Sequence, residues 1–148
     1  MPSEIGELRA FVYVTPFDQV RHMAFILGDI GTGKSVLTRL HRGHMIGDVL
    51  GGAKVLRKAM AKIKQEGSGV IVYLQDGAAG VPSTAVPSPE DTSESARTKQ
   101  WREVGLGAQI LTDLGISSIR LLVSANRTYI GVTGFGIDIE STEHIPRE

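Results

Sequence analysis

The sequence predicts an α/β protein in which a mixed, partly antiparallel sheet carries two main helices. Short runs of β-branched and aromatic residues alternate along the chain with two longer segments of helical periodicity. The expected order is three strands, a helix, a strand, a loop, a second helix and three closing strands. A chain of 148 residues with 41% apolar and 22% charged residues fits one domain over residues 1–148.

Three short antiparallel strands are expected in the first third of the chain. Leu8–Val14 and His22–Leu27 are rich in aromatic and β-branched residues, and Pro16 and Asp18 between them suit a turn. The glycine-rich segment GDIGTG predicts a second turn, which leads into Val36–His41.

Two segments have the periodicity of amphipathic helices. Over Asp48–Glu66, apolar residues recur at steps of three and four, and Gly67 is expected to end the helix. The second helix is expected over Ala96–Leu114 and ends at Gly115, although each of two glycines inside it weakens it by about 1 kcal/mol. The residues expected to face inward are Val49, Ala53, Leu56, Met60 and Ile63 in the first helix and Trp101, Ala108, Leu111 and Leu114 in the second.

The remaining segments complete the sheet. Ser68–Leu74 is continuous and β-branched, which predicts a central strand covered on both faces. Gly80–Ser95 contains three of the six prolines among serines and acidic residues, and is predicted to be a mobile loop. The closing strands are expected at Ser118–Val123, Tyr129–Val132 and Ile137–Glu140.

Composition excludes several classes of function. Sixteen basic and sixteen acidic residues give a net charge of zero, so neither nucleic acid nor a membrane surface is an expected partner. The absence of cysteine excludes disulfides, thiolate nucleophiles, iron–sulfur clusters and cysteine-based zinc sites. The first ten residues do not resemble a signal peptide, and apolar stretches reach only about seven residues, so we expect a cytoplasmic protein.

The segment GDIGTGKS, residues 28–35, matches the G-x-x-x-x-G-K-[ST] pattern of a phosphate-binding loop. That loop works only where a helix begins at the Lys–Ser pair, because the helix N-terminus supplies the backbone amides. Here Ser35 is followed by VLTRLH, which favours a strand. We therefore expect a glycine-rich turn, and a small nucleotide hydrolase with a helix directly after Lys34 is the alternative.

Seven blocks in order along the chain resemble the GTP cyclohydrolase II family of riboflavin synthesis. They are GELRAFVY, HMAFILGDI, VLTRLH, GDVLGG, AMAKIKQEGSGVIVYL, REVGLGAQILTDLGISSIRLL and GFGIDI. The resemblance implies a dimeric, zinc-dependent enzyme that opens the imidazole ring of GTP, releases formate, and releases pyrophosphate after attack by an arginine on the α-phosphate. It also implies that GDI lies in a hairpin turn between two strands.

The sequence departs from the family pattern at the metal. The resemblance implies three zinc-binding cysteines, but His44 stands at the first of these positions, and the segment that carries the other two is shortened. A substitute site of His41, His44 and Asp48 is conceivable, because imidazole and carboxylate bind zinc, although Asp48 also suits a helix cap. We expect neither metal nor cofactor, and therefore no GTP cyclohydrolase II reaction.

Five residues remain candidates for a site. By resemblance, Arg102 matches the arginine nucleophile, and Arg39 and His41 match the phosphate side of the site. Asp76 follows a buried strand, where a carboxylate suits general acid–base catalysis, and Arg127 follows a later strand from which it could reach a phosphate. Three of them also have a structural interpretation: Arg102 as a solvated helix residue, and Asp76 and Arg127 as turn residues.

These observations predict a zinc-independent enzyme related to GTP cyclohydrolase II. Its expected substrate is a nucleotide or a phosphorylated ribosyl small molecule, in which it hydrolyses a phosphoester, N-glycosidic or ring C–N bond, and its expected assembly is a homodimer. The alternative is a catalytically inactive homologue that binds a nucleotide or a partner protein.

Overall fold

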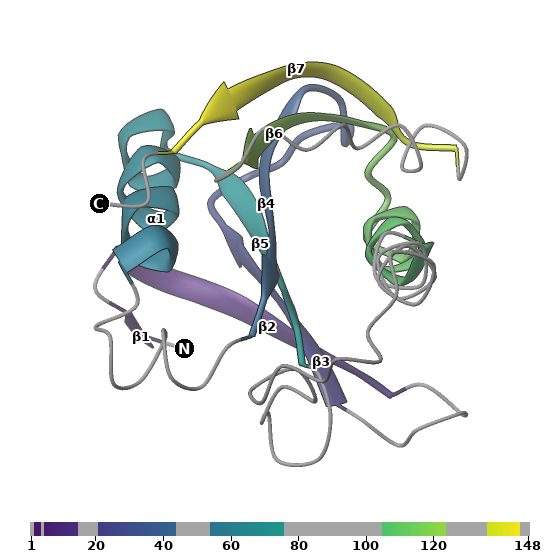
Figure 1. The fold of residues 1–148 in the computed structure, drawn as a ribbon, viewed down its shortest axis with the longest axis horizontal. Helices are drawn as coiled ribbons and strands as arrows, with labels where there is room; N and C mark the ends of the chain where they lie inside the picture. The colour runs from purple at the N-terminus through teal and green to yellow at the C-terminus, as the bar shows by residue number, and fades with distance from the viewer. Residues whose placement is uncertain are drawn as a thin grey trace, which may run out of the picture.

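A mixed sheet forms the centre of the molecule, with helices on both of its faces (Figure 1). The computed structural model describes residues 2–3, 5–14, 21–43, 54–75, 105–123 and 136–145. Within these residues the sheet has seven strands in the order β1-β2-β3-β5-β4-β6-β7. The elements are β1 (Pro2–Ser3), β2 (Gly6–Val14), β3 (Arg21–Leu27), β4 (Val36–Arg42), α1 (Lys54–Glu66), β5 (Gly69–Leu74), a helix over residues 105–113, β6 (Ser118–Val123) and β7 (Asp138–His144).

The sheet divides into an antiparallel and a parallel half, which confirms the predicted α/β fold with a mixed sheet. β1, β2, β3 and β5 pair antiparallel, whereas β5, β4, β6 and β7 pair parallel. β5 occupies the middle of the sheet, as its continuous apolar sequence predicts.

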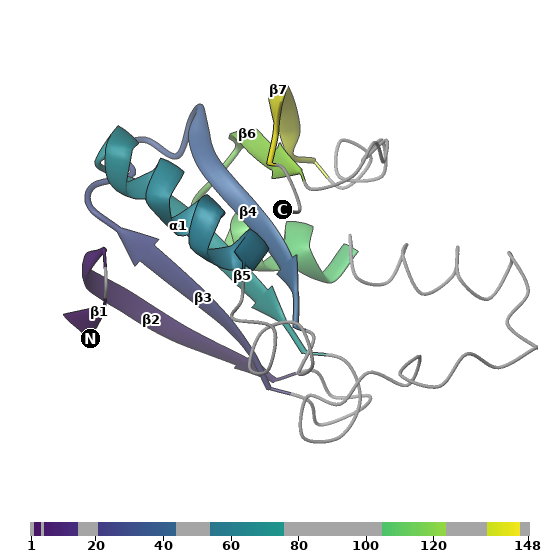
Figure 2. The same ribbon diagram turned by 60° about the vertical axis from the view of Figure 1, so that its left-hand side comes forward.

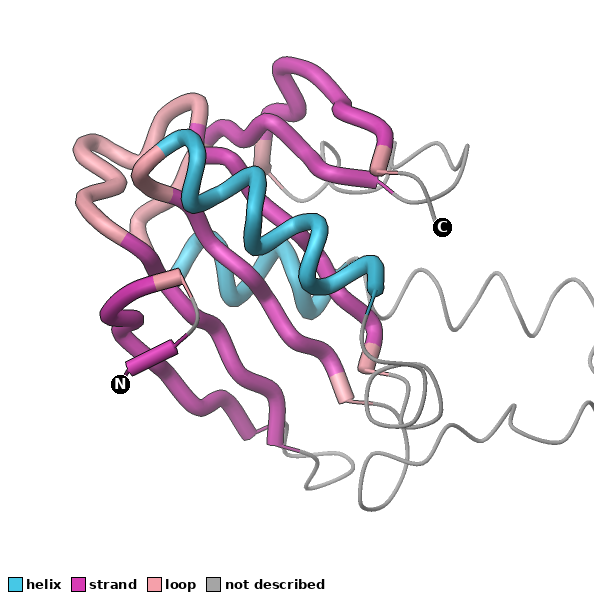
Figure 3. The backbone as a smooth tube through the Cα atoms, turned by 90° about the vertical axis from the view of Figure 1, so that its left-hand side faces the viewer, coloured by secondary structure: helices cyan, strands magenta, loops and turns pink. Residues whose placement is uncertain are grey.

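The predicted hairpin at GDIGTG is wrong. β3 and β4 flank this segment in the chain, but β5 lies between them, antiparallel to β3 and parallel to β4 (Figure 3). The glycines do make a tight turn, since Gly28, Gly31 and Gly33 all have positive φ. Local sequence predicts the turn but cannot show that a later strand inserts between its two arms.

An apolar cluster covers each face of the sheet. α1 lies over one face and the helix over residues 105–113 lies over the other (Figure 2). The cluster beneath α1 comprises Leu37, Ala59, Ile63, Ile71, Leu122 and Ile145. The cluster on the opposite face includes Ala24, Ile26, Leu40, Val70, Val72, Ala108, Ile110 and Leu111. Of the predicted inward positions in α1, Ile63 is buried and Leu56 and Met60 are half-buried, while Ala59 was not predicted.

Both helices end at the predicted glycines. The Gly67 amide donates to the carbonyls of Ile63 and Lys64. At Gly115, the amide donates to Thr112 and the next amide, of Ile116, donates to Leu111, which is the pairing of a Schellman motif. The positive φ of both glycines explains why a residue without a Cβ stands there.

Gly107 has a packing role that its helix propensity does not reveal. A Cβ placed on this glycine would lie 3.2 Å from Cδ2 of Leu40 on β4. The glycine therefore lets the helix approach the sheet closely, and this packing offsets part of the intrinsic destabilisation.

The closing strands are partly as predicted. β6 has the predicted bounds, and β7 begins at Asp138, runs beyond Glu140 and pairs parallel to β6. The predicted loop Gly80–Ser95, the predicted strand Tyr129–Val132 and the beginnings of both predicted helices lie outside the described residues. None of the described helices has the length and apolarity needed to span a membrane.

Candidate functional site

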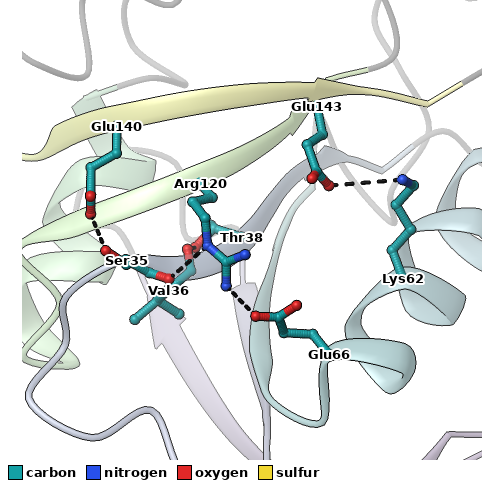
Figure 4. Close-up of polar contacts among 8 residues, drawn as sticks. All are labelled: Ser35, Val36, Thr38, Lys62, Glu66, Arg120, Glu140 and Glu143. Atoms are coloured by element: carbon teal, nitrogen blue, oxygen red, sulfur yellow. Dashed lines mark hydrogen bonds and ion pairs between the residues drawn. The ribbon is translucent and has the colours of Figure 1, made fainter.

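The phosphate-loop motif is a structural junction rather than a nucleotide site. β4 begins at Val36, directly after Ser35, so the required helix is replaced by a strand and the nucleotide hydrolase alternative is wrong. Ser35 has a φ of 55° and donates through its hydroxyl to the Glu140 carboxylate on β7 (Figure 4). Arg120 on β6 donates from Nε to the Ser35 carbonyl at 3.0 Å and from Nη2 to Glu66 of α1 at 2.6 Å.

The strand order makes the opposite, carboxyl edge of the parallel strands the candidate site for a ligand. From β4 the chain crosses one face through α1 to reach β5. From β5 it crosses the other face through the helix over residues 105–113 to reach β6, on the far side of β4. β4 and β6 are therefore the neighbours at which the strand order reverses, and ligands of open α/β sheets bind outside the carboxyl ends of such a pair.

Arg39 lies across this boundary. The pairing of β4 with β6 runs from Val36–Ile119 to Thr38–Leu121, and one residue further the Arg39 Nη1 donates to the Leu122 carbonyl at 3.0 Å. The side chain is only 6% exposed. A guanidinium buried to this degree requires polar partners, and its planar set of five donors suits a phosphate as well as carbonyl oxygens.

His41 lies two residues further along β4, on the same face of the strand as Arg39. It is 5% exposed, and its ring centroid is 5.3 Å from that of Tyr73, its register partner on β5. The Gly43 amide then donates to the Leu74 carbonyl, and a Cβ on this glycine would lie 2.7 Å from the Tyr73 ring. The structure thus brings Arg39 and His41 together on the α1 face of the sheet.

A third buried polar side chain, His22, was not singled out from the sequence. It is 3% exposed on β3, and its Nδ1 accepts the Gln75 amide at 3.1 Å. The pattern that could have identified it is the alternation of buried and less buried residues along β3, in which His22 shares the inward face with Ala24 and Ile26. Because the face alternates along a strand, His22 lies on the side of the sheet opposite to α1.

The other candidates lie outside the described residues. Asp76 is the second residue after β5, Arg127 is the fourth after β6, and Arg102 precedes the described helix by three residues. Their roles remain predictions.

The donor set does not fit the zinc site of three cysteines that the family resemblance implies. The chain has no cysteine. The described ranges contain no group of three or more His, Asp or Glu side chains that could hold a metal ion. Two of the three residues of the conceivable substitute site, His44 and Asp48, lie outside these ranges.

A sheet with this strand order belongs to the doubly wound α/β class, in which ligands bind outside the carboxyl ends of the strands at the switch point, and Arg39 is buried beside that point. Comparison with known proteins is more specific. The sequence model of the GTP cyclohydrolase II family matches residues 1–146, and the chain belongs to this family.

Its relatives include riboflavin biosynthesis proteins named RibBA. The protein from Bacillus mycoides (strain KBAB4) is 33% identical over 162 residues, which cover 99% of this chain. The protein from Chlorobium phaeovibrioides (strain DSM 265 / 1930) is 32% identical over 164 residues, which cover all of it. The chain spans about 40% of the length of these curated relatives.

Proposed function

We propose that this chain is a zinc-independent enzyme on the GTP cyclohydrolase II scaffold that acts on a nucleotide or a phosphorylated ribosyl small molecule. The reaction is hydrolysis of a phosphoester, N-glycosidic or ring C–N bond, in a specialised biosynthetic pathway. The observation that carries the proposal is the buried Arg39 at the boundary between β4 and β6.

Arg39 supports a phosphorylated ligand because its charge is permanent and its orientation is restrained by the Leu122 carbonyl. His41 adds a second buried nitrogen ligand on the same face. Arg127 would supply the second phosphate contact, Asp76 general acid–base catalysis, and Arg102 nucleophilic attack on a phosphate, as the family resemblance implies.

Zinc independence rests on the chemistry of the donor set. A zinc-bound water has a pKa of about 7, which is what makes metal-assisted ring opening possible at neutral pH. With no thiolate in the chain, acid–base side chains must activate the water or the leaving group.

The absence of the zinc-binding cysteines also favours a second candidate, an inactive homologue that binds a nucleotide or a partner protein. Loss of the cysteines removes the water-activating centre of the family without removing the arginine at the switch point. Turnover separates the enzyme from a nucleotide-binding inactive homologue, since both of these predict nucleotide binding.

A homodimer is supported by the surface of β2. Phe11, Val12 and Val14 are exposed on this strand, and β1 pairs only with Gly6 and Glu7 of it within the described residues. Sedimentation equilibrium of the wild type tests the assembly, and a monomer at all concentrations contradicts it.

Ligand binding is tested by thermal unfolding of the full chain with GTP, ribose 5-phosphate or pyrophosphate. A ligand at about 100 times its dissociation constant stabilises the protein by about 2.7 kcal/mol. Arg39→Lys removes the planar donor set and is expected to weaken binding about tenfold or more. Arg9→Lys is the matched control, because Arg9 also donates to one backbone carbonyl, that of Gly28, but is exposed and far along the sheet.

The outcomes discriminate clearly. No stabilisation by any phosphate compound contradicts the enzyme and the inactive homologue that binds a nucleotide, and leaves the homologue that binds a partner protein. Stabilisation with a new product seen by mass spectrometry supports the enzyme, and stabilisation with none supports the inactive homologue. One equivalent of tightly bound zinc, or formate released from GTP, contradicts zinc independence.

A further inference from the structure

The two edges of the sheet differ in how they are protected from pairing with another chain. At one edge, β7 carries Asp138, Glu140 and Glu143, and its pairing with β6 contains a register shift. Charged side chains and irregular pairing are the usual means by which an edge strand avoids a further strand. At the other edge, β2 has neither over Ala10–Val14, whose sequence AFVYV is uncharged and whose pairing with β3 is regular.

Among the described strands, none covers the outer edge of Ala10–Val14. β1 pairs only with Gly6 and Glu7 within these residues, and it lies beside only the beginning of β2 (Figure 2). The large apolar side chains that are exposed in the described part of the chain all lie on β2, and Val12 is 58% exposed. An uncharged strand with exposed apolar side chains is suited to pairing with a further strand.

The segment AFVYV is also self-complementary. A two-fold axis that pairs a strand antiparallel with its own copy sets each residue opposite the one equally far on the other side of the centre. About Val12 the segment has the same order of residue types in both directions: an aromatic residue beside the central valine, then an apolar residue. Ala10 then faces Val14 of the second copy, Phe11 faces Tyr13, and Val12 faces its own copy.

The two faces of β2 agree with this arrangement. Phe11 and Tyr13 lie on the face away from α1, where the Tyr13 hydroxyl donates to Asp113 at 2.8 Å. Aromatic pairs therefore form on one face and small apolar pairs on the other, and both kinds stabilise a sheet. A centre at Phe11 would instead set Arg9 opposite Tyr13 and extend the pairing towards the residues that β1 covers.

We propose that a second copy of this chain pairs antiparallel with β2 through Ala10–Val14, with Val12 at the two-fold axis, so that the two sheets join into one. The inference deepens the homodimer proposed above by naming its strand and its register. It does not depend on the ligand, so binding and turnover are tested separately from it.

Charges placed at the axis test the pairing. Val12→Lys and Val12→Glu each set two like charges opposite one another, and each should weaken dimerisation about tenfold or more in sedimentation equilibrium. An equimolar mixture of the two variants should form a dimer again, because a lysine then faces a glutamate. Thr142→Lys is the matched control, because it adds the same charge at an exposed position of β7 and should leave the dimer unchanged.

Single cysteines test the register, because the chain has no cysteine of its own. Antiparallel register partners have Cα atoms about 4.5 or 5.5 Å apart, which a disulfide can span. Val12→Cys should therefore give a disulfide-linked dimer with oxidised glutathione. Phe11→Cys should not, because its copy lies about 7 Å further along the strand as well as about 5 Å across it. Thermal midpoints show that each variant is folded.

Three results overturn the inference. A wild type that is monomeric at all concentrations contradicts both the homodimer and the pairing, and leaves the edge to a strand of another protein. A dimer that persists in Val12→Lys and in Val12→Glu forms through another surface and contradicts the pairing alone. A disulfide-linked dimer of Phe11→Cys but not of Val12→Cys contradicts the register.

Discussion

The two ends of the parallel strands use polar residues in opposite ways. At the amino end, Ser35, Glu140, Arg120 and Glu66 form a chain of hydrogen bonds and an ion pair near water. At the carboxyl end, Arg39 and His41 are almost fully buried. Exposed contacts of the first kind contribute little to stability, whereas a buried polar group without its partner is strongly destabilising. The amino end of the parallel strands carries the phosphate-loop motif, and its polar residues thus have a structural role.

This contrast shows why a motif needs its structural context. The glycines of GDIGTGKS serve a turn that packs against the end of the second helix, where Ser117 donates to the Gly33 carbonyl at 2.8 Å. Arg39 and His41, in contrast, look like ordinary residues of an amphipathic strand, and only the strand order shows that they lie beside the switch point.

The largest expected loss of stability is at Gly33, and it tests whether backbone packing holds the amino end of the parallel strands in place. Gly33 has a φ of 80°, and a Cβ there would lie 2.0 Å from the Gly115 carbonyl oxygen. Gly33→Ala should lower the free energy of unfolding by about 3 kcal/mol, the sum of backbone strain and the steric clash. Urea unfolding measures this loss.

Gly31→Ala is the matched control for Gly33→Ala. Gly31 has a φ of 60° but nothing within 4 Å of the added Cβ, so only the strain of about 1 kcal/mol remains. Equal losses in the two variants would show that packing against Gly115 does not hold this end.

A smaller effect is expected at Tyr13, the register partner of His22. Burial, reinforced by Asp113, raises the pKa of Tyr13 to about 12. The folded state therefore retains the proton more strongly than the unfolded state, so this contribution to stability is complete below pH 10 and is lost as the pH rises towards 12.

Tyr13→Phe should lower the free energy of unfolding by about 1 kcal/mol at neutral pH and should reduce the loss of stability in the alkaline range. Urea unfolding across that range, together with ultraviolet titration of tyrosinate, measures both effects. Asp113→Asn keeps an acceptor without the charge and should fall between wild type and Tyr13→Phe. An unchanged alkaline profile in Tyr13→Phe would contradict the assignment.

The smallest effect is expected at Glu140, which is fully exposed. Hydrogen bonds from Ser35 and Ser118 hold the pKa of this carboxyl below its ordinary value of 4.5. The ionised form therefore favours the folded state above pH 4.5, and the contribution is lost as the pH falls through the lowered pKa.

Glu140→Gln should make the stability of the protein slightly less sensitive to acid, as measured by urea midpoints at about pH 6 and about pH 3. Glu143→Gln controls for the loss of a carboxylate from the same strand, where Glu143 lies 3.8 Å from Lys62. If Glu140→Gln loses as much stability as Gly33→Ala, the amino end is not the weakly coupled surface described above.

Much of the secondary structure could be predicted because it depends on neighbouring residues. The strand Ser118–Val123, the helix ends at Gly67 and Gly115, and the buried β5 all follow from local patterns. The role of Gly107 could not be predicted, because it depends on Leu40, a residue far away in the chain.

By itself, the sequence determined the class of the fold, the family resemblance, and the absence of every thiolate ligand, since these depend on composition and short-range order alone. The tertiary structure decided the rest. In the folded protein β5 lies between β3 and β4, the segment that matches a phosphate loop leads into a strand, and His22 accepts a hydrogen bond from the Gln75 amide. Strand order and burial arise from contacts between residues distant in the chain, and no local pattern contains them.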